Sequence, residues 1–310
     1  MGIADRSVGC VLGLALGDAL GAPFEGRRAR HIPDPLPAFE LPWMDRPPGS
    51  TTDDTAMARN LVRSLTARRR FDPEDLITRH LEWLGTNPPD VGILTGRVLR
   101  RVAQGRRPED AARTEWEERG PEVSAGNGSV MYCAPLGVAY ANRPEALLEL
   151  APRLSALTHH DGRCRTAVVA VTVAVAGLVR EESPDAAVAA ALRAAQDRDG
   201  GEELEFLVEA VGDTRPIDGP DQGFCLFTAG VGLQALHRDG SFEHELVRVV
   251  SLGGDTDTNA AVAGALLGAA AGSAALPERW LGRLIDRDII EREAEALIPL
   301  AAARTGPAGG

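Results

Sequence analysis

Glycines recur at every fourth position in two separate stretches of the chain. They are Gly9, Gly13, Gly17 and Gly21 in the first stretch and Gly264, Gly268 and Gly272 in the second. Residues four apart share one helix face, so each series forms a ridge that another backbone can approach closely. Each glycine costs a helix about 1 kcal/mol relative to alanine, which packing has to offset. We predict two helices whose ridges meet each other or a common neighbour; the alternative is chance spacing in a chain rich in glycine and alanine.

The rest of the sequence is typical of helices. Periodicity predicts helices over 73–86, 92–103, 130–141, 163–180, 184–198, 202–211 and 224–237. The valines of 163–180 would suit a strand, but the length of this run favours a buried helix. No stretch shows sustained alternation of period two. The sequence therefore predicts an all-α fold, with one compact domain over residues 1–303 and a disordered tail over 304–310.

Composition narrows the classes of partner. Hydrophobic residues make up 44% and charged residues 25% of the 310 residues, which is enough for a large core in one domain. The net charge of −12 disfavours a nucleic-acid-binding surface. A small phosphorylated ligand is still possible, because all the basic residues other than histidine are arginines, and arginine binds phosphate well.

The sequence also predicts an intracellular location. The four cysteines are widely spaced without a C-x-x-C pair, as expected of free thiols in a reducing cytoplasm. The N-terminal stretch lacks the basic region and cleavage site of a signal peptide. The apolar runs 167–179 and 260–276 are too short, or too rich in alanine and glycine, to predict a membrane span. We expect both to be buried helices.

Two clusters of acids and hydroxyls each open a helical segment. One is Ser50-Thr51-Thr52-Asp53-Asp54-Thr55, and the other is Gly253-Gly254-Asp255-Thr256-Asp257-Thr258-Asn259. Either cluster alone could be a helix N-cap, since Ser, Thr and Asp are preferred there. A cap needs only one such residue, whereas each cluster brings two carboxylates that repel each other unless a cation offsets their charge. Hard oxygens without interleaved Cys or His favour Mg²⁺ or Mn²⁺ over zinc.

Two further acids stand in loops. Glu25 follows the first glycine-spaced helix, where the helix dipole disfavours an acid, so it is either functional or a solvated surface residue. Asp90 lies in the rigid segment Asn87-Pro88-Pro89-Asp90. Spacing alone favours Asp90 as the N-cap of the helix predicted over 92–103.

Three features could contact a phosphorylated ligand. The turn Gly126-Asn127-Gly128-Ser129 could cradle a phosphate with its backbone N–H groups, although a plain loop has the same sequence signature. His159 begins a helical run, where a surface or capping role is the common one. Phe224 and Phe227 could stack on a ligand, but a core position is the simpler interpretation.

Taken in order, these motifs resemble those of the ADP-ribosylglycohydrolase family. The matching segments are 13–21 with Glu25, Thr52-Asp53-Asp54, Asp90-Val91-Gly92, 126–131, Thr158-His159 and 254–259. The likeness extends over nearly the whole chain. It implies a single all-helical domain with a binuclear Mg²⁺ or Mn²⁺ centre at the base of a cleft for ADP-ribose.

The resemblance also implies roles for particular residues. Metal ligands would be Thr52, Asp53, Asp54, Asp255, Asp257 and Thr258. Catalytic residues would be Glu25 and Asp90. The substrate would contact Gly126, Asn127, Gly128, Ser129, Met131 and His159. The chain departs from the family pattern at Tyr132-Cys133, where many relatives carry arginine. The resemblance therefore does not say which side chains line the cleft at this point.

The implied activity is hydrolysis of the bond between ADP-ribose and a protein side chain, with arginine favoured by the Asp90 loop. The alternatives are an ADP-ribosyl-serine or a free ADP-ribose derivative as substrate, or a non-catalytic relative that only binds ADP-ribose. Cleavage at the ribose anomeric carbon passes through an oxocarbenium-like state, which calls for nearby carboxylates and a positioned water. We expect neither nucleic acid nor membrane among the partners.

Overall fold

The computed structural model describes residues 2–238 and 240–304. The earlier helices are α1 (Ile3–Gly21), α2 (Asp53–Arg68), α3 (Pro73–Gly85), α4 (Ile93–Ala103), α5 (Pro108–Arg119), α6 (Ala134–Ala139) and α7 (Pro144–Ala156). The later ones are α8 (Gly162–Val179), α9 (Pro184–Ala195), α10 (Gly201–Ala210), α11 (Cys225–His237), α12 (Phe242–Ser251), α13 (Thr256–Ala271), α14 (Glu278–Leu281), α15 (Arg287–Glu295) and α16 (Ile298–Ala302). Short 3-10 helices cover Ala22–Phe24, Ala29–His31, Pro121–Val123 and Ser273–Ala275. The all-α prediction is confirmed.

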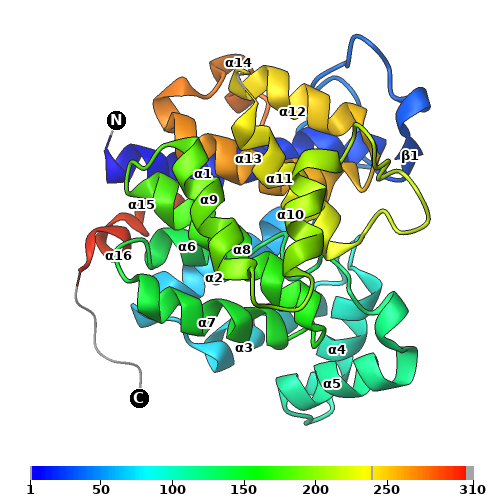
Figure 1. The fold of residues 1–310 in the computed structure, drawn as a ribbon, viewed down its shortest axis with the longest axis vertical. Helices are drawn as coiled ribbons and strands as arrows, with labels where there is room; N and C mark the ends of the chain where they lie inside the picture. The colour runs from blue at the N-terminus through cyan, green and yellow to red at the C-terminus, as the bar shows by residue number, and fades with distance from the viewer. Residues whose placement is uncertain (1, 239, 305–310) are drawn as a thin grey trace.

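The two glycine ridges face each other in the centre of the molecule. Helices α1 and α13 run side by side (Figure 1), and a Cβ added at Gly13 would collide with the carbonyl oxygen of Gly264. The same holds in the opposite direction, and between Gly9 and Gly268. The predicted contact is therefore real: the glycines let two backbones approach to a distance that any side chain would prevent. This contact fixes the C-terminal end of α1 beside the start of α13.

Most predicted helices are present, with ends that agree to within three residues. One exception is 130–141, where the chain stays in turns to residue 133 and α6 covers only Ala134–Ala139. Backbone N–H groups of Val130 and Met131 both donate to the carbonyl of Asn127, which tightens the turn, and Pro135 then occupies the first turn of α6. The other exception is the apolar run 260–276, because α13 ends at Ala271. Two two-residue strands that the sequence did not predict, β1 (Arg27–Arg28) and β2 (Gly253–Gly254), pair antiparallel.

In the part of the chain that the structure describes, two helices are long and apolar enough to cross a membrane, but they form the core here. An 18-residue apolar stretch within Ile3–Phe24, which contains α1, is 94% buried in the molecule, and the corresponding stretch of α8 is 78% buried. All four cysteines are buried and free, as predicted. Residues 305–310 of the predicted tail lie outside the described residues. The single domain over 1–303 stays a prediction.

Candidate metal centre and active site

A buried aspartate outside the predicted set of site residues holds the first acid cluster in place. Asp18 of α1 is fully buried and accepts hydrogen bonds from the backbone N–H of Thr52 (3.0 Å), the N–H of Thr55 (3.0 Å) and the Thr55 hydroxyl (2.5 Å). Burial raises the pKa of Asp18 to about 6, although these hydrogen bonds oppose the shift. Asp18 thus anchors the start of α2. A single acid in an otherwise apolar stretch of helix was the signal that could have identified it.

The second cluster is delivered by β2. Gly253 and Gly254 have φ values of 69° and 76°, which glycine adopts without strain. A Cβ at Gly253 would meet the backbone of residues 27–29, so glycine also permits the pairing with β1. Through this pairing the short β1–β2 ladder holds Glu25, just before β1, close to Asp255, just after β2.

The two clusters meet across the helix starts. The Thr258 hydroxyl of α13 donates to Asp54 Oδ2 of α2 (3.3 Å), and the Thr52 hydroxyl donates to the same oxygen (3.2 Å). The other carboxylate oxygen of Asp54 and Oδ1 of Asp257 are buried without a hydrogen-bond partner. Burial first, and repulsion by neighbouring carboxylates second, raise the pKa of Asp54 and Asp257 well above the usual value. Unpartnered buried carboxylate oxygens beside two hydroxyls are the donor set that Mg²⁺ or Mn²⁺ binds.

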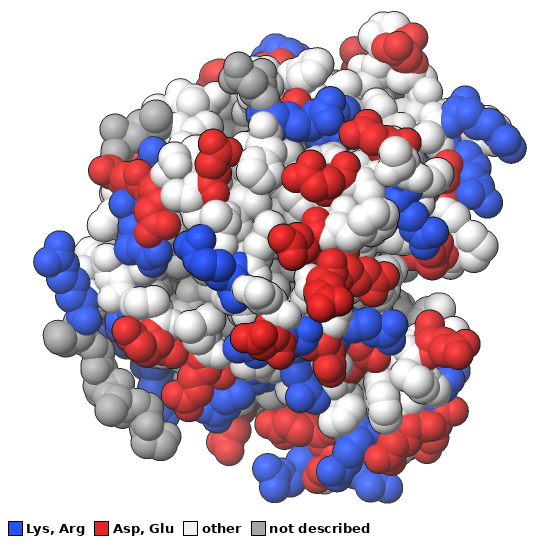
Figure 2. All heavy atoms as spheres, in the orientation of Figure 1, with Lys and Arg blue, Asp and Glu red and all other residues white. Residues whose placement is uncertain are grey.

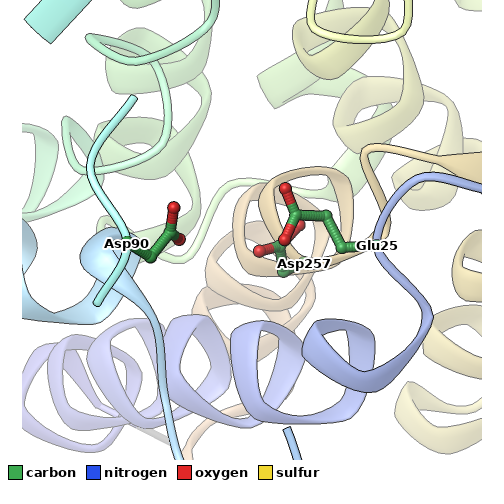
Figure 3. A group of neighbouring side chains, drawn as sticks. All are labelled: Glu25, Asp90 and Asp257. Atoms are coloured by element: carbon green, nitrogen blue, oxygen red, sulfur yellow. The ribbon is translucent and has the colours of Figure 1, made fainter. Parts of the chain in front are cut away.

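Three carboxylates converge at the open side of this cluster. Oxygens of Glu25, Asp90 and Asp257 all lie within 4.8 Å of one another (Figure 3). Although Glu25 lies at the surface, partial loss of water around its carboxyl and repulsion by Asp255 and Asp90 raise its pKa to about 7. The pKa of Asp90 is raised as well, mainly by burial. Carboxylates this close together form a stable arrangement only if a bound proton or cation offsets their negative charge.

Asp90 is not the N-cap of the following helix. That position belongs to Gly92, which makes no side-chain cap, and the N–H of Gly92 instead donates to Asp53 Oδ2 at 3.1 Å. The bond ties the Asp90 loop to the start of α2. Of the two alternatives for Asp90, the structure therefore rejects the cap and places its carboxyl in the acid cluster.

The Gly126 loop supports the second cluster through one side chain. The amide of Asn127 donates to Asp255 Oδ2 (2.9 Å) and to the hydroxyl of Thr228 (3.0 Å), which in turn donates to Asn259 (2.8 Å). The amide of Asn127 therefore orients an acid of the cluster, and its predicted contact with the substrate stays a prediction. Thr228 was not predicted, because no local pattern marks a single buried threonine on α11.

The other predicted ligand contacts surround the same loop. The ring of His159 lies against Gly126 and Gly128, and burial lowers the pKa of His159 to about 4, so the ring is neutral. Met131 is almost fully buried. The Ser129 hydroxyl is also buried and bonds to Ser155 at 2.9 Å, so its side chain supports the loop. A ligand role for these residues stays a prediction.

The structure also places Tyr132, Cys133, Phe224 and Phe227, whose positions the sequence left undecided. Tyr132 and Cys133, where the chain departs from the family pattern, are fully buried, and Tyr132 packs edge-on against His80. The departure from the family pattern therefore affects the core, and these two side chains do not line the cleft. Phe227 is buried, while Phe224 is partly exposed and packs edge-on against it.

Comparison with known proteins agrees with this geometry. A family model described as ADP-ribosylglycohydrolase matches residues 1–307. The ADP-ribosyl-[dinitrogen reductase] glycohydrolase of Rhodospirillum rubrum is 31% identical, with 96% of this chain and 97% of the relative covered. The ADP-ribosylhydrolase ARH3 of Gallus gallus is 28% identical, with 89% and 88% covered. A solved structure titled ADP-ribosylglycohydrolase-related protein complex aligns with a TM-score of 0.81 at 35% identity, covering 96% of this chain and 99% of that one.

Fold, acid cluster and whole-length similarity together define a glycohydrolase that acts on ADP-ribosylated substrates. The chain belongs to the ADP-ribosylglycohydrolase family. The metal dependence of that family agrees with the acidic cluster of Glu25, Asp90 and Asp257.

Proposed function

We propose that this enzyme hydrolyses the bond between ADP-ribose and an arginine side chain of a modified protein. The observation that carries the proposal is the convergence of Glu25, Asp90 and Asp257 within 4.8 Å at the open side of the buried cluster. Of these, Glu25 and Asp90 are not among the proposed metal ligands, and their carboxylates match the planar, positively charged guanidinium that an arginine linkage presents. The similarity to the R. rubrum glycohydrolase, which extends over almost the whole of both chains, supports an ADP-ribosylated protein as the substrate.

We further propose that the cluster holds two divalent cations, Mg²⁺ or Mn²⁺. Their ligands would be Thr52, Asp53, Asp54, Asp255, Asp257 and Thr258. When bound, the cations would supply Lewis-acid stabilisation of the ribose hydroxyls and of the reacting water. The unpartnered oxygens of Asp54 and Asp257 are the part of the donor set that supports this assignment most directly.

The protein's own groups would then complete the reaction. One of Glu25 and Asp90 accepts the proton of the attacking water at a carboxylate oxygen, and the other stabilises positive charge at the ribose anomeric carbon. Asp18 and Asn127 would position the cluster through their hydrogen bonds to α2 and Asp255. The Gly126 loop with His159 would bind the ADP-ribose. We place the enzyme in the cytoplasm because its buried cysteines are free thiols.

A second linkage is favoured by one observation. ADP-ribosylhydrolase ARH3 also matches over 89% of this chain, so an O-linked substrate such as ADP-ribosyl-serine is the alternative. The test is a panel of peptides carrying ADP-ribose on arginine or on serine, assayed for ADP-ribose release with Mg²⁺ and with Mn²⁺. We expect release from the arginine peptide. Release from the serine peptide alone would assign the enzyme to the O-linked class, and binding without release would make it a non-catalytic relative.

A further inference from the structure

One edge of the active site is strongly basic in a chain that is acidic overall. Arg27 and Arg28 of β1 and Arg30 of the following 3-10 helix are exposed, while the whole chain has a net charge of −12. We call these three arginines the basic edge. Of these three arginines, only Arg28 forms an ion pair with a described residue, which is Asp218 at 3.5 Å. The charges of Arg27 and Arg30 are therefore available to another molecule.

The basic edge is held in place beside the catalytic acids. Arg27 pairs across the ladder with Gly254, which directly precedes Asp255, and Arg27 follows Glu25 by two residues. Its guanidinium lies over the ring of buried Phe24, 5.5 Å from the ring centre, which restricts its motion. Figure 2 shows basic side chains gathered at the end of the molecule where Figure 1 places β1, with acidic side chains nearer the middle of the same face.

We propose that the basic edge docks an acidic segment of the modified protein, adjacent to its ADP-ribosylated side chain. This inference rests on the proposed function, because it names the kind of protein that brings the substrate. The modified side chain would enter among Glu25 and Asp90, while carboxylates a few residues away would meet Arg27 and Arg30. Opposite charges arranged in this way fix the orientation of the partner and speed its association.

An acidic protein segment fits better than other anions. The phosphates of ADP-ribose have a separate expected site at the Gly126 loop, which is linked to Asp255 through Asn127. A long polyanion such as RNA would extend beyond three arginines and meet the surrounding negative charge. A short acidic segment needs favourable charge only within roughly a Debye length, about 8–10 Å at physiological salt.

The test compares two ADP-ribosyl-arginine peptides that differ only in four flanking residues, glutamate in one and glutamine in the other. We expect the wild-type enzyme to show a kcat/KM about tenfold higher for the glutamate peptide at low salt, with the preference falling as salt is added. The Arg27→Gln/Arg30→Gln variant should lose the preference. It should still cleave free ADP-ribosyl-arginine like the wild type, which also shows that it is folded. The matched control is Arg106→Gln/Arg193→Gln, two exposed arginines on other parts of the surface, which should keep the preference.

The outcomes separate this proposal from the proposed function. If the wild type cleaves no ADP-ribosyl-arginine, the linkage is wrong, and the same comparison with ADP-ribosyl-serine peptides tests the basic edge. Equal rates on both peptides would overturn the docking proposal. A loss of free-substrate turnover in Arg27→Gln/Arg30→Gln would overturn it too, since the arginines would then bind ADP-ribose itself. Binding of a single-stranded RNA that depends on Arg27 and Arg30, without peptide preference, would assign the surface to nucleic acid.

Discussion

Glu25 and Asp90 approach the same group of carboxylates from two different loops, one after α1 and one before α4. If both act on the reacting bond, Glu25→Gln and Asp90→Asn should each lower kcat by about a hundredfold or more. Each change keeps the size of the side chain and removes the charge that an oxocarbenium-like state requires. Steady-state kinetics on an ADP-ribosylated peptide measures kcat, and calorimetry with ADP-ribose should show a much smaller change in affinity.

The same variants separate catalysis from folding. Because Gly92 and not Asp90 occupies the N-cap of α4, Asp90→Asn should not lower the melting temperature. A clear drop in melting temperature with unchanged kcat would return Asp90 to a structural role. Near wild-type turnover in both variants would show that neither residue handles the proton.

At the scale of elements, the contact between α1 and α13 decides the geometry of the site. A methyl group at Gly13 would meet the backbone of Gly264, so Gly13→Ala should destabilise the protein by about 2 kcal/mol or more, despite the better helix propensity of alanine. Gly85 at the end of α3 has no atom within 4 Å of an added Cβ, which makes Gly85→Ala the matched control. Its stability should be unchanged or slightly higher. Urea unfolding of both variants measures the difference, and equal stabilities would mean that the ridges are not in contact.

How far the sequence could predict each element depends on the range of the interactions that form it. Glycine spacing, apolar periodicity and capping residues act within a few turns, so α1, α8 and α13 were predictable from local patterns. The start of α6 was not, because its position depends on a turn closed on Asn127, which itself bonds to the distant Gly223. The β1–β2 ladder joins residues far apart in sequence, and two residues per strand leave no alternating pattern.

The candidate site follows the same rule. Acids that occur in clusters were recognisable, since their density is unusual for caps. Asp18 and Thr228 were missed because each is a single polar residue in an apolar helix, and only the fold shows what it bonds to. The role of Asn127 in orienting Asp255 was missed for a related reason: the two residues lie 128 positions apart along the chain.

At the scale of the whole molecule, the acid cluster should make stability depend on both pH and metal. Burial and mutual repulsion raise the pKa values of Asp53, Asp54 and Asp257 in the folded state, and Glu25 titrates near 7. The folded protein therefore binds more protons than the unfolded chain. Stability from these groups is fully present below their unfolded pKa of about 4 and is lost as pH rises through the folded values.

This linkage predicts a metal effect that grows with pH. Without metal, the Asp54→Asn/Asp257→Asn variant should melt at a higher temperature than the wild type at pH 8, because the substitutions remove repelling charges. Added Mn²⁺ should raise the melting temperature of the wild type more at pH 8 than at pH 5.5, and that of the variant at neither pH. Thermal melts of both proteins in the four conditions provide the measurement. A metal-free wild type that is more stable than the variant at pH 8 would contradict the assigned repulsion.

We propose that α1 and α13, held together by their glycine ridges, bring the two acid clusters into one divalent-cation centre. Titration calorimetry of the metal-free enzyme with Mn²⁺ tests it most directly, with Asp54→Asn/Asp257→Asn as the variant and the exposed Asp197→Asn as the control. We predict binding of two ions per chain to the wild type and to Asp197→Asn. The double variant should keep its helical circular dichroism but lose Mn²⁺ binding, because amides hold hard cations far more weakly than carboxylates do. Wild-type affinity and stoichiometry in the double variant would contradict the account.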